Sequence, residues 1–220
     1  MTCLSERTPT IVVVCEGETE ETFVRRVLSV HLTQKTFKPS CLGGIEPNGY
    51  KKLVGGVRQW LRTKGITHVT TMIDFYKLPS DFPRQTQATS DPSDPYDKVR
   101  SLEKALAEEI QDARFIPYIM LHEFEALLLT KTGLEIIRKR ARVGKNDRSW
   151  KELQRDLARV RKPEMLNDGA NSHPSARIKA IWPRFKKTTD GVGILEQVPW
   201  EELCAACHHF GDWIRKLEAL

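Results

Sequence analysis

The chain has 220 residues and a formal net charge of +6, and this length suits one sizeable domain or a core with a smaller appendage. No apolar stretch approaches the ~20 residues that a membrane-spanning helix needs, and the first residues lack the apolar region of a signal peptide. The five cysteines are odd in number and scattered, as in reduced cytosolic proteins. We therefore expect a cytoplasmic protein that does not enter a membrane.

The first predicted strand ends in an acid followed by a glycine. Residues 11–15 (Ile-Val-Val-Val-Cys) are apolar and mostly β-branched, which predicts a strand buried on both faces. Gly17 permits a tight turn into a helix, with Thr19 as its predicted cap and Glu20 in its first turn. Glu16 is then presented at the carboxyl end of a central strand, the edge at which open α/β sheets bind ligands and metals.

A second acid repeats this arrangement. Asp74 directly follows residues 69–73 (Val-Thr-Thr-Met-Ile), another short run that predicts a strand. Taken alone, either Glu16 or Asp74 could cap a helix or lie in a solvated loop. Taken together, two strand-end carboxylates indicate a site for a divalent metal.

The rest of the first half alternates between strand and helix patterns. A strand is predicted within residues 37–45 and a helix over 50–61, and this alternation favours a parallel sheet with right-handed crossovers. Residues 79–95 are rich in Pro, Ser, Asp and Thr, which predicts a long surface loop. A helix from Pro95 and a strand over 115–121 follow.

A third acidic site follows that strand, in the segment His122-Glu123-Phe124-Glu125. If this segment is extended, Glu123 and Glu125 point to the same side, as a metal-binding pair would. If a helix has already begun, the two carboxylates diverge. Both alternatives are compatible with the sequence.

Positive charge is concentrated between Lys131 and Lys162, where twelve Lys and Arg residues accompany four Asp and Glu residues. A stretch of this kind suits nucleic-acid phosphates, and its plain alternative is a solvated helix face. The candidate nucleic-acid-binding residues are Arg138, Arg142, Lys145, Arg148 and, further along the chain, Arg177.

The three strand-end sites together suit phosphoryl chemistry assisted by one or two metal ions. Mg²⁺ and Mn²⁺ prefer hard oxygen ligands, and a remaining carboxylate can transfer a proton. The candidate catalytic residues are Glu16, Asp74, Glu123 and Glu125. The sequence contains no Gly-rich Walker loop and no dinucleotide-binding fingerprint, so nucleotide-binding folds of those kinds are not indicated.

Glu16-Gly17 after the first strand and Asp74 after the third resemble the Toprim fold, which type II and IA topoisomerases, bacterial primases and overcoming-lysogenisation-defect nucleases share. The chain resembles more closely a prokaryotic Toprim-like family of unknown function, and this similarity extends over nearly all of it. The segments that carry it are residues 15–20 (Cys-Glu-Gly-Glu-Thr-Glu), 72–79 (Met-Ile-Asp-Phe-Tyr-Lys-Leu-Pro), 122–128 (His-Glu-Phe-Glu-Ala-Leu-Leu), 174–178 (Pro-Ser-Ala-Arg-Ile) and 207–210 (Cys-His-His-Phe).

The resemblance implies a four-stranded parallel Toprim sheet, a Mg²⁺-dependent site and, often, an AAA or ABC-type ATPase encoded by a neighbouring gene. Glu16 matches the acid usually assigned to acid/base chemistry, and Asp74 matches the first metal-binding aspartate. The usual Asp-x-Asp is broken here, because its second position is Tyr76. The missing ligand would then come from Asp81, Glu123 or Glu125, so the expected metal ligands are Glu16, Asp74, Asp81 and Glu125.

We therefore expect an α/β protein with a Toprim-like core over residues 1–130 and a basic, mainly helical extension over residues 131–220. The expected function is a Mg²⁺- or Mn²⁺-dependent nuclease that cleaves DNA or RNA as the effector of an ATPase-linked antiphage defence module, and that could form a homo-oligomer. The alternative is a non-catalytic Toprim-like scaffold that binds the ATPase, nucleic acid or both.

Overall fold

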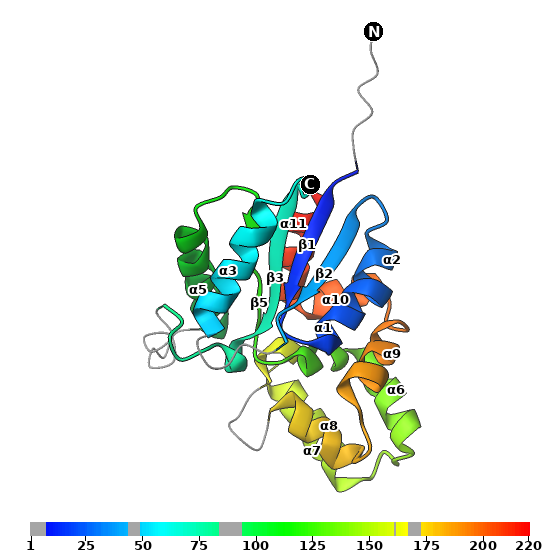
Figure 1. Cartoon of the computed structure of the whole chain (residues 1–220). Coiled ribbons are helices and arrows are strands. Elements are labelled where there is room, and N and C mark those ends of the chain that lie inside the picture. Colours follow the sequence, from blue (N-terminus) through cyan, green and yellow to red (C-terminus); the bar gives the residue numbers. More distant parts are fainter. Residues whose placement is uncertain (1–7, 44–48, 84–93, 161, 167–172) are drawn as a thin grey trace.

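A parallel β-sheet forms the centre of the computed structural model, which describes residues 8–43, 49–83, 94–160, 162–166 and 173–220 (Figure 1). The strand order is β2-β1-β3-β4, and β5 pairs with β3 beyond β4. Every pairing is parallel, which confirms the predicted α/β fold. The strands are β1 (Thr10–Cys15), β2 (Thr36–Cys41), β3 (His68–Asp74), β4 (Phe115–Ile116) and β5 (Ile119–Met120).

The strand predicted over residues 115–121 is interrupted, because β4 and β5 are separate short strands on either side of Pro117. Proline has no N–H to donate, so the ladder with β3 cannot run through it. The hydroxyl of Thr71 replaces part of that ladder: it donates to the Tyr118 carbonyl (2.8 Å) and accepts from the Tyr118 amide (2.9 Å). The chain therefore stays beside β3 as far as Asp74, which pairs with Met120.

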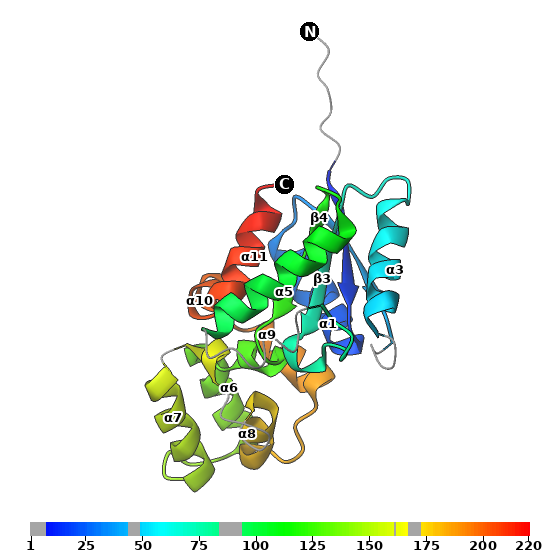
Figure 2. The same ribbon diagram turned by 90° about the vertical axis from the view of Figure 1, so that its left-hand side faces the viewer.

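Helices cover both faces of the sheet (Figures 1 and 2). The alternation along β1 explains this arrangement, since Val12 and Val14 enter one apolar cluster and Ile11, Val13 and Cys15 enter the other. Helices α3 (Gly49–Leu61) and α5 (Pro95–Ile110) cover the Val12 face. The opposite face is covered by α1 (Glu18–Phe23), the π-helical η1 (Val24–Leu28), α10 (Trp200–Ala206) and α11 (His208–Glu218), and α2 (Ser29–His31) continues η1.

The start of the first helix differs from the prediction. Gly17 is the N-cap of α1, so the helix begins at Glu18 and the predicted Thr19 cap is wrong. The Glu20 carboxylate accepts a hydrogen bond from the Gly17 amide (3.1 Å), which leaves no capping role for the Thr19 hydroxyl. Thr19 instead contacts Thr188 through the two hydroxyl groups (2.9 Å).

The remaining helices lie beyond the carboxyl ends of the strands (Figure 1). They include α6 (Lys131–Ala141), α7 (Arg148–Val160), α8 (Pro174–Ile181) and α9 (Val192–Leu195), with the short turns η2 (Phe75–Lys77), η3 (Phe124–Leu128), η4 (Pro163–Met165) and η5 (Lys187–Gly191). The C-terminal part is thus mainly helical, as predicted.

The last helix returns to the sheet. The Trp213 ring of α11 stacks on Tyr118 (4.3 Å between ring centroids), and its indole N–H donates to the Thr70 hydroxyl (2.9 Å). In the described part of the chain, no helix is both long and apolar enough to span a membrane. Residues 84–93 of the predicted surface loop lie outside the described residues.

Candidate functional site

Two buried acids meet at the carboxyl edge of the sheet. Glu16 follows β1 and Asp74 ends β3, and these strands are hydrogen-bonded neighbours, so their ends lie side by side. The Asp74 amide donates to the Glu16 carboxylate (3.3 Å), and the Asp74 carboxylate accepts from the Phe124 amide (3.2 Å). The predicted convergence of Glu16 and Asp74 is therefore present, with Asp74 only 1% exposed.

Two further acids complete what we call the carboxylate cluster, defined as Glu16, Glu20, Asp74 and Glu125. Glu20 comes from the first turn of α1 and Glu125 from η3, and both are buried. Sequence reasoning placed Glu20 in the first turn of the helix and did not count it among the site residues. The available signal was its position three residues after the Gly17 N-cap, where a capping-box carboxylate folds back toward the preceding strand.

Two lysines neutralise the carboxylate cluster, and neither was predicted. The Lys187 ammonium lies 3.2 Å from Glu20, 3.4 Å from Asp74 and 3.6 Å from Glu125. The Lys77 ammonium lies 2.7 Å from Glu16 and 3.7 Å from Asp74. Lys187 is 23% exposed at its side chain and Lys77 is 55% exposed, so both lie between the buried acids and solvent.

The electrostatics of the cluster follow from burial and crowding. Burial raises the pKa of Asp74 to about 7, with Glu20 and Glu16 adding to the rise while Lys187 opposes it. Burial alone would lower the pKa of Lys187, but Asp74, Glu20 and Glu125 raise it well above its usual value. The site thus stabilises positive charge strongly and tolerates a lone carboxylate poorly.

The donor chemistry of the cluster suits Mg²⁺ or Mn²⁺, since carboxylate oxygens are the ligands these ions prefer. Within the described residues, however, no three Asp, Glu, His or Cys side chains are arranged so that they could hold a metal ion. The Lys187 ammonium lies among three of the cluster carboxylates. A divalent cation bound by these acids would have to take the place of that ammonium.

Glu123 does not join the cluster, which resolves the two alternatives for residues 122–125 in favour of divergence. Glu123 is the extended residue before η3, whereas Glu125 lies inside that turn. The Glu123 carboxylate contacts His173 (3.0 Å) and accepts from the Ser175 amide (3.0 Å). It therefore stabilises the positive N-terminus of α8 rather than pairing with Glu125.

Asp81, the other expected ligand, is also placed elsewhere. Its exposed carboxylate accepts a hydrogen bond from the Tyr50 amide (3.4 Å) at the beginning of α3. Of the expected metal ligands, the structure brings together Glu16, Asp74 and Glu125. The fourth carboxylate of the cluster is Glu20 and not the expected Asp81.

Some of the predicted nucleic-acid-binding residues are exposed, and others are partly buried in ion pairs. Arg142, Lys145 and Arg148 are exposed around the connection from α6 to α7, and Arg148 pairs with Glu152 (3.0 Å). Arg138 contacts Glu135 (3.3 Å) and is partly buried. Arg177 is only 12% exposed at its side chain and is tied to Asp156 of α7 (2.5 Å), so it joins α8 to α7 instead of facing solvent.

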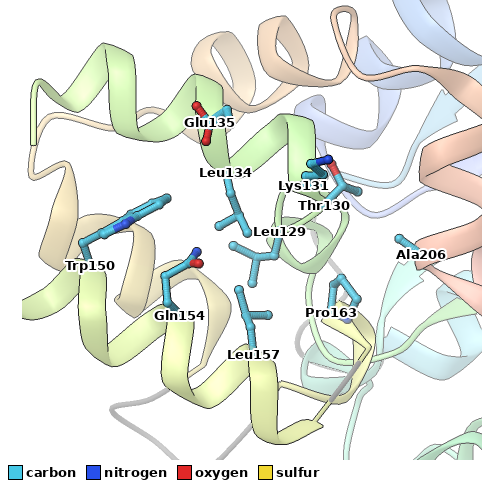
Figure 3. A pocket seen from close by; sticks show the side chains of 10 residues that line it. All are labelled: Leu129, Thr130, Lys131, Leu134, Glu135, Trp150, Gln154, Leu157, Pro163 and Ala206. Atoms are coloured by element: carbon cyan, nitrogen blue, oxygen red, sulfur yellow. The ribbon is translucent and has the colours of Figure 1, made fainter. Parts of the chain in front are cut away.

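A separate hollow of about 400 Å³ lies between α6 and α7 (Figure 3). Its wall is mainly apolar, and none of the four cluster carboxylates lines it. The lining side chains belong to Leu129, Thr130, Lys131, Leu134, Glu135, Trp150, Gln154, Leu157, Pro163 and Ala206. This hollow is therefore distinct from the strand-end site.

The fold and the site define an α/β protein with a parallel sheet whose strand ends carry a buried, lysine-neutralised carboxylate cluster. The chain belongs to the family described as a domain of unknown function, DUF4276, whose model matches residues 15–218. No curated protein and no solved structure matches the chain. The family match covers every cluster residue and both lysines.

Proposed function

We propose that this protein is a Mg²⁺- or Mn²⁺-dependent nuclease built on a Toprim-like core, which acts in the cytoplasm on DNA or RNA. The observation that carries the proposal is the carboxylate cluster at the ends of β1 and β3. Four acids concentrated at a buried sheet edge are costly to maintain unless cations bind there. Functional sites are where such costs are commonly found.

The ligands proposed are Asp74, Glu125 and Glu20, with Glu16 as ligand or proton-transfer group. A cation bound there would supply Lewis-acid stabilisation of the attacking and leaving oxygens. Glu16 then accepts a proton from the attacking water as the new P–O bond forms and the P–O ester bond breaks, and the leaving oxygen takes up a proton.

The two lysines have different proposed roles because their exposures differ. Lys77 is half-exposed beside Glu16, so its ammonium can contact a substrate phosphate and stabilise its charge. Lys187 holds the cluster together in the absence of a divalent cation. The exposed cations Arg142, Lys145 and Arg148 hold the flanking phosphate backbone.

A second candidate is a non-catalytic scaffold. The observation that favours it is the Lys187 ammonium, which already lies among three carboxylates as a permanent counter-ion would. In this case the sheet serves to bind an AAA or ABC-type ATPase, nucleic acid or a second copy of the chain. In the nuclease case, the same ATPase partner restrains or positions the protein as the effector of an antiphage defence module.

The experiment is a cleavage assay on labelled single- and double-stranded DNA and RNA, with Mg²⁺, Mn²⁺ or EDTA, with and without the proposed AAA or ABC-type ATPase partner. We expect metal-dependent cleavage that Glu16→Gln lowers at least about 100-fold. Glu18→Gln is the matched control, since it makes the same chemical change at an exposed position two residues away.

Cleavage that survives Glu16→Gln would refute the assigned site. Absence of cleavage under every condition, together with no Mn²⁺ binding by calorimetry, would favour the scaffold.

A further inference from the structure

An exposed aromatic ring lies next to the carboxylate cluster. Tyr76 falls between Asp74 and Lys77 in the turn that ends β3, and 49% of its surface is exposed. The neighbouring Phe75 is buried in the core beneath the sheet edge. Single exposed aromatic residues are common on protein surfaces, so exposure alone indicates nothing.

The Tyr76 ring is held rigidly, which distinguishes it from an ordinary surface side chain. It stacks on the His122 ring, with 5.3 Å between centroids and an interplanar angle of 18°. Phe75 contacts it edge-on at 5.4 Å. These two contacts restrain the orientation of the ring before any ligand arrives.

The supporting residue has an unusual conformation. His122 has φ +72, a left-handed backbone that a side chain other than glycine adopts at a cost of about 1 kcal/mol. Its ring is buried, and its Nδ1 has no hydrogen-bond partner among the described residues. Strain of this kind next to a cluster of buried acids is a reason to look for a functional role.

The chemistry of Tyr76 favours its ring over its hydroxyl. A tyrosine hydroxyl is protonated at neutral pH and is then a weak nucleophile. The flat, preoriented ring remains available for stacking. Nucleobases stack on such rings regardless of sequence, which is how many proteins hold single strands.

We propose that Tyr76, supported by His122, is a stacking platform for an unpaired nucleobase of the polynucleotide whose phosphate contacts Lys77. The inference rests on the proposed nuclease function and names its substrate class, a single strand or a strand with an unpaired nucleotide. A base inside a duplex is already stacked on its neighbours and cannot occupy the platform without leaving the helix. Lys77 follows Tyr76 directly, so base and phosphate are read by adjacent residues.

The test measures binding in EDTA, so that cleavage is not required. Full-length wild type, Tyr76→Ala and Tyr76→Phe are titrated with a single-stranded oligonucleotide that carries 2-aminopurine, with the matched duplex and with the mononucleotide AMP. Val30→Ala is the matched control, since Val30 is the other large hydrophobic residue found exposed in the described chain.

We expect Tyr76→Ala to weaken single-strand binding roughly 10-fold and to abolish the stacking-dependent quenching of 2-aminopurine. Tyr76→Phe keeps the ring and should retain both. Duplex binding, which depends on phosphates, should be unchanged in all variants. An abasic site in place of the stacked base should weaken strand binding by the wild type. It should not weaken strand binding by Tyr76→Ala any further, because that variant has already lost the ring.

Several outcomes would overturn the inference: no single-strand binding by the wild type, equal binding by wild type and Tyr76→Ala, or an equal loss on duplex. Competition by AMP as strong as that by the oligonucleotide would assign the platform to a free nucleotide instead of a strand. Failure of the nuclease function can be distinguished from failure of this inference. Quenching of 2-aminopurine without cleavage would refute the nuclease function and leave the stacking platform in place.

Discussion

The protein contains two groups of buried acids that are neutralised in different ways. The carboxylate cluster at the sheet edge is neutralised by Lys77 and Lys187, whose ammonium groups lie toward solvent. Glu103 and Glu164, buried between α5 and α11, are neutralised mainly by hydrogen-bond donors of the core itself.

The second group, Glu103 and Glu164, is held by hydrogen bonds from the core of the fold. Glu164 accepts hydrogen bonds from the His209 amide (2.9 Å), the Phe210 amide (3.0 Å) and the Tyr96 hydroxyl (3.2 Å), which stabilises the N-terminus of α11. Glu103 accepts from the Ile119 amide (2.9 Å) and contacts the His209 ring (2.8 Å).

This difference separates acids whose partners belong to the fold from acids whose counter-ion can be exchanged. A carboxylate held by backbone amides cannot change partners without unfolding a helix end, because those amides would lose their acceptor. A carboxylate held by a lysine side chain can exchange that ammonium for another cation by a rotamer change. Glu16, Glu20 and Asp74 of the cluster also accept backbone amides, but each uses its other oxygen for a lysine. The cation at the sheet edge can therefore be exchanged while those amide bonds stay in place, which is a property of a site that binds and releases a ligand.

The largest effect is expected from Lys187→Met. Removing this cation leaves buried carboxylates unpaired, which costs several kcal/mol, and protonation of Asp74 relieves part of that cost. We expect a loss of about 3 kcal/mol in the free energy of unfolding in EDTA, measured by urea denaturation at pH 7. On the nuclease proposal, millimolar Mg²⁺ or Mn²⁺ should restore most of it, because a divalent cation then replaces the ammonium.

Lys186→Met is the matched control, since Lys186 is exposed and adjacent. If neither Mg²⁺ nor Mn²⁺ reverses the destabilisation of Lys187→Met, a divalent cation cannot replace the ammonium in the cluster. That result would favour the scaffold.

A smaller effect is expected from Glu164→Gln in the structural group. The amide keeps the shape of the side chain but replaces one acceptor oxygen by an NH₂ group, so one of the buried His209 and Phe210 amides loses its acceptor. We expect a loss of about 2 kcal/mol by urea denaturation, with no recovery on adding Mg²⁺ or Mn²⁺. Glu196→Gln, which breaks only the exposed pair with Arg26, should cost less than about 1 kcal/mol. Metal-dependent recovery of Glu164→Gln would remove the distinction between the two groups.

The smallest effect concerns pH. Burial lowers the pKa of His209, but the hydrogen bond to Glu103 raises it more, so the folded pKa lies above the usual value. The stabilisation is then fully present below the unfolded pKa of about 6.5 and declines as the pH rises through the folded pKa. We expect His209→Gln to cost roughly 1–2 kcal/mol at pH 5 and less at alkaline pH.

Denaturation of wild type and His209→Gln across this pH range checks the expectation, with His208→Gln, at an exposed position, as control. A stability difference that stays constant with pH would show that His209 is not charged against Glu103.

Local sequence patterns determined much of the fold. The apolar run before Glu16 predicted β1, because strands buried on both faces are mostly apolar, and the β-branched run before Asp74 predicted β3. The strand–helix alternation then required these two acids to reach the same edge of a parallel sheet. The helix predicted from Pro95 does begin there, with Asp94 as its cap, since capping depends on neighbouring residues alone.

Tertiary structure decided which charged groups met. Lys187 reaches Asp74 from 113 positions away in the chain, and no local pattern encodes that contact. Glu123 and Glu125 are separated because η3 begins between them and α8 offers its N-terminal amides to Glu123. The sequence determined that acids would reach the sheet edge, whereas three-dimensional packing decided their counter-ions. The physical reason is that strand ends follow from short-range hydrophobic patterning, while the energy of a buried charge depends on whichever groups the whole fold brings within a few ångströms of it.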